Sequence, residues 1–157
     1  AASSVAEGRD KLMAALHSGA GLEKLRQMIV AQGGDPACCD DVSQLPQAKI
    51  IRDVPAVEGG YIRSMDTIRL GNAAQAMGAG RKKKTDSIDY SVGFVMRKRI
   101  GDELRPGDAV ATVHASSEES ASRAAGEILA SLSLSPTPVP RCKLIHAFVD
   151  SEHVERL

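Results

Sequence analysis

The residues best suited to bind an anion lie in one short segment, where Arg81, Lys82, Lys83 and Lys84 follow Gly80. Backbone amides in a glycine turn and clustered cations both favour a phosphate or another polyanion. However, the segment has no aromatic residues among its cations and no Gly-Lys-[Ser/Thr] pattern of the Walker type. We therefore predict a solvated basic loop, with phosphate contact as the alternative hypothesis.

The histidines offer few catalytic combinations. His17, His114, His146 and His153 are scattered along the chain, and only His114, which falls within a predicted strand, is a serious catalytic candidate. Because it follows the apolar Val113, we expect a partly buried, hydrogen-bonded side chain there and not a catalytic one.

The acidic residues lead to a similar interpretation. Asp86 and Asp89 could form a carboxylate pair, but an aspartate near a serine and a turn usually caps backbone amides. Asp40 and Asp41 are interpreted as a solvated pair in a loop. The sequence thus predicts no catalytic, cofactor-binding or metal-binding residue in this chain.

The cysteines favour a reducing compartment. Cys38 and Cys39 are adjacent and Cys142 is remote, which matches neither a metal-ligand spacing nor an obvious disulfide framework. We expect three reduced thiols in a cytoplasmic protein.

Composition excludes other classes of protein. The 157 residues suffice for one ordinary domain or a small domain with appended helices, and a 3% aromatic content predicts an aliphatic, alanine-rich core. Twenty basic residues balance twenty acidic ones, so no general attraction to nucleic acid or an anionic membrane is implied. No apolar run approaches the ~20 residues that span a bilayer. The start at Ala1, without an initiator methionine or a leader pattern, predicts a fragment without a signal or transit peptide.

Two helices are predicted at the N-terminal end. Ser4 and Glu7 match a capping box, in which the serine accepts the Glu7 amide and the glutamate reaches back. The pattern continues to residue 18, and a second helix is predicted for residues 22–32. Together they form a short helical hairpin, with a domain boundary within residues 35–46.

The remainder predicts a mixed α+β domain. Asp66 or Thr67 caps one helix, and Ser116 and Glu119 match a capping box for another, whose alanine-rich face should pack on a sheet. Three prolines make the linker after that helix extended. Strands are predicted for residues 48–54, 61–65, 92–100, 109–115 and 143–149, followed by a polar, frayed tail.

Two turns lie in the middle of this domain, at Gly101-Asp102 and Pro106-Gly107. Their spacing resembles the hairpin of biotinyl and lipoyl carrier domains, which have a barrel-sandwich hybrid fold. Those carriers continue into a tip with an acylated lysine. Here Ser116 and Ser117 follow the second strand, so nothing can be acylated.

A longer series of motifs carries a more specific resemblance. It comprises Met-Gly-Ala-Gly-Arg (residues 77–81), Asp-Ser-Ile-Asp-Tyr-Ser-Val-Gly-Phe (86–94) and the hairpin ending in Val-His-Ala (113–115). Two upstream segments, residues 4–12 and 31–36, extend it. In this order the motifs are similar to the C-terminal domain of the pyrimidine nucleoside phosphorylases, the family that includes thymidine phosphorylase. The resemblance covers about residues 4–149.

The resemblance implies an architecture. Residues 1–34 would be the terminal helices of the preceding phosphorylase domain, and residues 35–46 a linker. Residues 47–150 would be the C-terminal domain, a mixed α/β domain with a barrel-sandwich-hybrid-like β core, followed by a tail at 151–157. The fold class is therefore α+β.

The resemblance also implies an activity for a parent protein. In this family a pyrimidine nucleoside reacts with phosphate, without a cofactor, to give the free base and a pentose 1-phosphate. The α domain holds the pyrimidine, the α/β domain holds the phosphate, and the two close together. The signature Ser-Gly-Arg-Gly-x-x-x-Thr-Gly-Gly-Thr-x-Asp-x-x-Glu is absent from these 157 residues. No catalytic residue is therefore transferred, and the chain alone is expected to be inactive.

The same resemblance implies a homodimeric parent that binds phosphate and nucleoside, and neither nucleic acid nor a membrane. The basic loop at residues 80–84 would then be a candidate for a position near the domain cleft. The alternatives are a free-standing barrel-sandwich binding module and a scaffold that lost catalysis.

Overall fold

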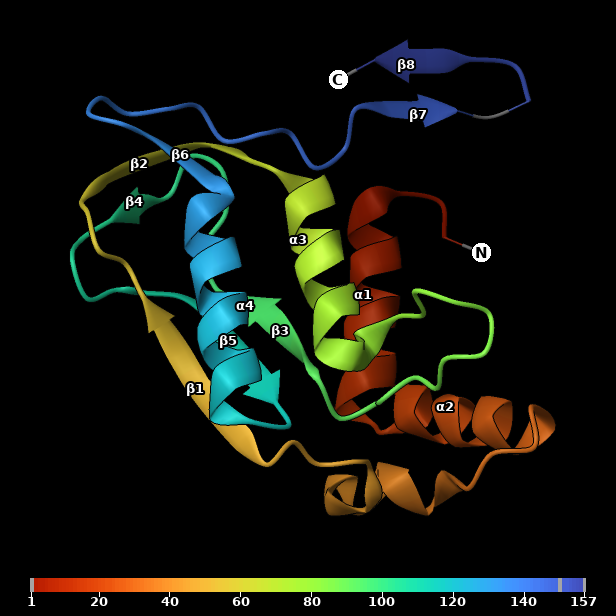
Figure 1. Cartoon of the computed structure of the whole chain (residues 1–157). Coiled ribbons are helices and arrows are strands. Elements are labelled where there is room, and N and C mark those ends of the chain that lie inside the picture. The colour runs from red at the N-terminus through yellow and green to blue at the C-terminus, as the bar shows by residue number, and fades with distance from the viewer. Residues whose placement is uncertain (1, 150, 157) are drawn as a thin grey trace. The chain divides into compact units, whose positions relative to one another are not determined.

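The chain divides into two compact units, Ala1–Pro46 and Gln47–Leu157, in a computed structural model that describes residues 2–149 and 151–156 (Figure 1). Ala1, Asp150 and Leu157, which belong to the predicted start and tail, lie outside the described residues. Within those residues, no helix has both the length and the apolar character that a membrane crossing needs.

The first unit contains two helices, α1 (Val5–His17) and α2 (Ala20–Ala31). Ser4 caps α1 as predicted, since its side chain accepts the Glu7 amide at 3.2 Å. The reciprocal bond differs, because the Glu7 carboxylate accepts the amide of Ser3, at 2.7 Å, and not that of Ser4. Hydrogen bonds from Lys11 and from Ser3 lower the pKa of Glu7 to about 2.

Two short 3₁₀ helices follow, η1 (Pro36–Cys39) and η2 (Val42–Gln44), and the aspartates between them are both engaged. Arg26 Nη1 donates to Asp40 Oδ2 at 2.6 Å, which ties α2 to this segment. The Asp41 carboxylate accepts the Ser43 amide at the start of η2. Both carboxylates are exposed in a loop, as predicted, and the structure adds a hydrogen-bond partner for each.

The second unit is built from antiparallel sheets and two longer helices, which confirms the α+β class; the barrel-sandwich character of the β core stays a prediction. One sheet has the order β1-β5-β3, another the order β4-β2-β6, and β7 pairs with β8. The bounds are β1 (Ile50–Pro55), β2 (Gly60–Met65), α3 (Thr67–Ala74), η3 (Gln75–Ala79), β3 (Gly93–Met96), β4 (Glu103–Leu104), β5 (Ala109–Ala115), α4 (Glu118–Ala130), β6 (Leu132–Ser135), β7 (Ala147–Val149) and β8 (Val154–Arg156).

The core lies between helix α4 and the sheet that contains β1 and β5. Ala121, Ala124 and Ile128 form the buried face of α4, as its alanine-rich pattern predicts. Their small side chains let the helix approach the sheet closely, where Val113 of β5 is also fully buried. Helix α3 lies beside α4 (Figure 1), so the two helices share this core.

Two predicted boundaries are wrong for reasons of pairing. The strand predicted for residues 92–100 ends at Met96, because the Arg97 and Lys98 amides both donate to the Val110 carbonyl, at 2.8 and 3.3 Å, and interrupt the ladder. The cap of α4 is Ser117 and not Ser116, and its side chain accepts the Ser120 amide at 3.2 Å. The cap lies one residue later than predicted because Ala115, the residue before Ser116, still pairs with Ile50 of β1.

Three strands, β4, β6 and β8, are absent from the prediction. Helix α4 ends at Ala130, so Leu132 belongs to β6 and not to the apolar face of the helix. The Asp66 amide donates to the Ser131 carbonyl at 2.8 Å, which fixes the point where the chain leaves the helix. Strand β8 falls in the tail predicted to be frayed, and it pairs with β7.

The two predicted glycine turns are confirmed. Gly101 and Gly107 have φ values of 89° and 92°, a region that other residues adopt at a cost. The second turn is held by Asp108, whose Oδ2 accepts from Lys98 Nζ at 3.0 Å and from the Arg105 amide at 3.2 Å. The Lys98 ammonium and then this amide lower the pKa of Asp108.

Candidate functional site

The basic loop at residues 80–84 is ordered by an acidic residue of its own. Asp86 Oδ2 accepts the amides of Lys82 and Lys83, at 3.1 and 2.9 Å, and the Asp86 amide donates back to the Lys83 carbonyl. A carboxylate thus occupies the place where backbone amides would hold a phosphate. These two amides are therefore not available to an external anion.

The basic side chains of the loop are solvated, as the sequence predicts. Residues 81–84 are all exposed, and they form no ion pair among the described residues. The start of the loop is tied to η3, because Gln75 Nε2 donates to the Arg81 carbonyl at 2.7 Å. The loop thus presents exposed charges on a backbone held by hydrogen bonds, which favours long-range attraction over a shaped anion site.

Asp89 has the second capping role that the sequence predicts. Its Oδ1 accepts the amide of Ser91 at 2.9 Å and the hydroxyl of Ser91 at 2.6 Å. These two bonds lower the pKa of Asp89. Asp86 and Asp89 therefore each serve a separate turn.

His114 lies in the middle of the sheet, opposite Ile51 of β1 and Gly93 of β3. It is half-buried, as predicted, but the expected hydrogen bond is not found within the described residues. The other three histidines are exposed. A general base needs a proton donor or a nucleophile within reach, and the described part of the chain supplies none to His114.

A polar relay crosses the same sheet and has no clear signature in the sequence. Thr112, only 6% exposed, accepts from Arg97 Nε at 2.9 Å and donates to Asp53 Oδ1 at 2.7 Å. The relay satisfies a buried hydroxyl and links β1, β5 and the end of β3. Because Thr112 is buried, its hydroxyl is closed to an external substrate, and the relay has a structural role.

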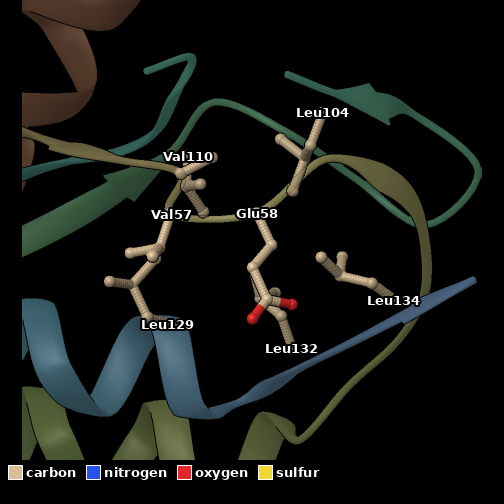
Figure 2. Close-up of a pocket in the computed structure, with 8 residues that line it drawn as sticks. Val57, Glu58, Leu104, Val110, Leu129, Leu132 and Leu134 are labelled. Atoms are coloured by element: carbon tan, nitrogen blue, oxygen red, sulfur yellow. The ribbon is translucent and has the colours of Figure 1, made fainter. Parts of the chain in front are cut away.

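An apolar hollow of about 380 Å³ opens near the end of α4 (Figure 2). Figure 2 shows the Glu58 side chain extending into this space, among apolar side chains from β4, β5, α4 and β6. The residues lining it are Ala56, Val57, Glu58, Leu104, Val110, Leu129, Leu132 and Leu134. One carboxylate among aliphatic groups can face a cation, but it has no second polar group with which to share a proton.

No metal or covalent cofactor site emerges from the rest of the described chain. No group of three or more His, Cys, Asp or Glu residues there could hold a metal ion. Cys38 and Cys39 are half-buried, Cys142 is exposed, and all three are free thiols. Strand β5 leads into the Ser117 cap of α4, where the carrier domains would present a lysine.

Comparisons with known proteins identify the family. Residues 61–135 match the family model described as the pyrimidine nucleoside phosphorylase C-terminal domain. This range runs from β2 through β6 and so includes the α4 core. The chain therefore carries the C-terminal domain of the pyrimidine nucleoside phosphorylase family.

Curated relatives give the same result. A pyrimidine-nucleoside phosphorylase of Geobacillus stearothermophilus is 37% identical over 145 residues, which cover 92% of this chain and 33% of that protein. The Bacillus subtilis protein of the same name is 41% identical over 112 residues, or 71% of this chain and 26% of the relative. A Staphylococcus aureus protein is 37% identical over 118 residues, or 75% and 27%. The chain thus spans about a quarter to a third of the length of these relatives.

Proposed function

We propose that this chain acts as the C-terminal segment of a pyrimidine-nucleoside phosphorylase. The observation that supports the proposal is the match to the Geobacillus protein, which extends over 92% of this chain but only a third of the relative. A match of this extent reaches into the first unit as well as the domain that follows. Residues 1–34 would complete a preceding domain, and residues 35–46 would link it to the C-terminal domain. Residues 47–150 would form that C-terminal domain, and residues 151–157 would be its tail.

The reaction of the parent protein is the reason why we expect the chain alone to be inactive. A phosphate oxygen attacks the anomeric carbon of a pyrimidine ribo- or deoxyribonucleoside as the bond to the base nitrogen breaks. The base leaves with the electron pair and takes up a proton, and the sugar becomes the 1-phosphate. This step needs groups that bind phosphate and stabilise charge on the base. The family signature that supplies such groups is absent from these 157 residues.

The contribution of this chain is mechanical rigidity. Helix α4 packs its buried face on β1 and β5, and Arg52 Nη1 reaches Glu118 at the first turn of α4, at 3.0 Å. Arg69 on α3 pairs with Glu127 on α4 at 2.6 Å. A body fixed in this way can move as a unit when two domains close on reactants.

The apolar faces of α1 and α2 support a place inside a longer protein. Leu12 and Leu16 on α1 are 68% and 67% exposed, and Met28 on α2 is 51% exposed. None of the residues in either helix is buried. Helices with such faces are stabilised by covering them, which in the relatives the remaining two thirds of the chain would do. A homodimeric parent in the cytoplasm is part of the proposal.

A chimera tests this function. The third of the Geobacillus stearothermophilus protein that matches this chain would be replaced by the present 157 residues, and thymidine and uridine phosphorolysis measured at saturating phosphate. We expect the chimera to be active, whereas the relative truncated at the same point and the isolated 157-residue chain are inert. A folded, dimeric chimera no more active than the truncated relative would refute the proposal and favour a scaffold domain.

A further inference from the structure

A second hollow in the Gln47–Leu157 unit has the composition of a ligand site. It measures about 510 Å³ and lies between the ends of β2 and β3, the turn at Gly101-Asp102 and the extended segment 141–144. Its floor contains the half-buried side chains of Met65, Met96 and Ile100. This volume falls within the range of pockets that bury small organic ligands, roughly 300–1,000 Å³.

The wall of this hollow is fixed by hydrogen bonds around one turn. Asp102 accepts the Arg99 amide at 2.9 Å through Oδ2 and Arg141 Nη2 at 2.7 Å through Oδ1. The Gly101 amide donates to the Ile62 carbonyl at 2.8 Å. A Cβ atom on Gly101 would lie 2.8 Å from Arg141 Cγ, so the absence of a side chain lets the extended segment close the wall.

The charges around the hollow are not balanced. Lys98 is paired with Asp108, and Arg141 is paired with Asp102. The side chains of Arg99 and Lys143, which also line the hollow, form no ion pair within the described ranges, 2–149 and 151–156. Two uncompensated cations thus flank an apolar floor.

We propose that this hollow binds a phosphomonoester that carries a flat aromatic ring, of the nucleoside monophosphate type. A phosphomonoester is close to a dianion at neutral pH, which matches the two cations, and arginine suits phosphate through its planar set of donors. Methionine side chains adapt to flat rings and make favourable sulfur–aromatic contacts. The site needs only residues of this chain, so the inference does not depend on the proposed phosphorylase function.

Calorimetric titration of the 157-residue chain with AMP tests the proposal. We expect adenosine and ribose 5-phosphate to bind at least about tenfold more weakly than AMP. Adenosine lacks the phosphate that the two cations would bind, and ribose 5-phosphate lacks the ring that the apolar floor would contact. The double variant Arg99→Ala/Lys143→Ala should also weaken AMP binding about tenfold or more. Both side chains are exposed, so the variant should fold, which circular dichroism verifies.

A matched control separates the site from general electrostatics. The double variant Lys82→Ala/Lys84→Ala removes the same charge from the basic loop, outside the hollow, and should leave AMP affinity within about twofold. Equal loss in the two double variants would overturn the proposal. Ribose 5-phosphate or inorganic phosphate binding as tightly as AMP would also overturn it, since only the cations would then be involved, and so would no binding of AMP.

Cys142 provides an independent readout because it is exposed and lines the same hollow. Bound AMP should slow alkylation of Cys142 by iodoacetamide several-fold. Alkylation of the half-buried Cys38 and Cys39, located by mass spectrometry, should not change. Protection of all three thiols or of none would contradict binding at this position.

Discussion

Replacing Ile128 by alanine tests whether the α4 face is the centre of the fold. The Ile128 side chain is 0% exposed and lies with Ala121 and Ala124 against the β1-β5-β3 sheet. Alanine lacks three of its carbon groups, which at about 0.8 kcal/mol each amounts to about 2.4 kcal/mol of lost burial. The cavity left between rigid elements raises the expected loss to about 3–4 kcal/mol.

This magnitude is a large fraction of the stability of a small domain, which is typically about 5–15 kcal/mol. Native-state hydrogen exchange of the β5 amides measures this loss of stability, because the slowest amides exchange only when the whole domain unfolds. The protein has no tryptophan, so exchange is also better suited than fluorescence. A loss of about 3 kcal/mol accelerates that exchange about 100-fold.

The matched control is Ile68→Ala, since Ile68 is also helical but 76% exposed. It should change stability by no more than about 0.5 kcal/mol. If Ile128→Ala does not fold, Ile128→Val should still cost about 1 kcal/mol. Equal effects of alanine at residues 128 and 68 would refute the assignment of the core.

Two further predictions concern charged groups. The folded-state pKa of Asp108 lies below its ordinary value, so its contribution to stability is present above about pH 4 and is lost as the pH falls through the folded value. The difference in urea midpoint between the wild type and Asp108→Asn should therefore shrink from pH 7 to pH 3, and a constant difference would contradict the Lys98 contact. In the active chimera, changing Lys82, Lys83 and Lys84 together to alanine should alter the KM for phosphate by no more than about twofold, because these exposed side chains act on an anion only through long-range attraction that salt screens. A tenfold rise would instead make the loop a phosphate site.

Local chemistry in the sequence determined the helices, the turns and the central strand. Ser4 caps α1 through the Glu7 amide, and this bond depends only on residues three apart. Gly101 and Gly107 adopt positive φ where the turns require it. The apolar run of β5 coincides with the predicted residues 109–115, because a strand buried on both faces needs a continuous apolar sequence. The motif series, which depends on order along the chain, also identified the family.

Tertiary pairing decided what these local signals could not. Strand β6 forms because its backbone pairs with β2, although its sequence is typical of the end of a helix and a linker. The cap of α4 moved to Ser117 because Ala115 pairs with Ile50, which lies 65 positions earlier in the sequence. The Asp53–Thr112–Arg97 relay and the hollow beside Arg99 join residues that only the register of the strands brings together. Sequence spacing encodes hydrogen bonds within a turn, but bonds between distant strands depend on which edges meet in the folded chain.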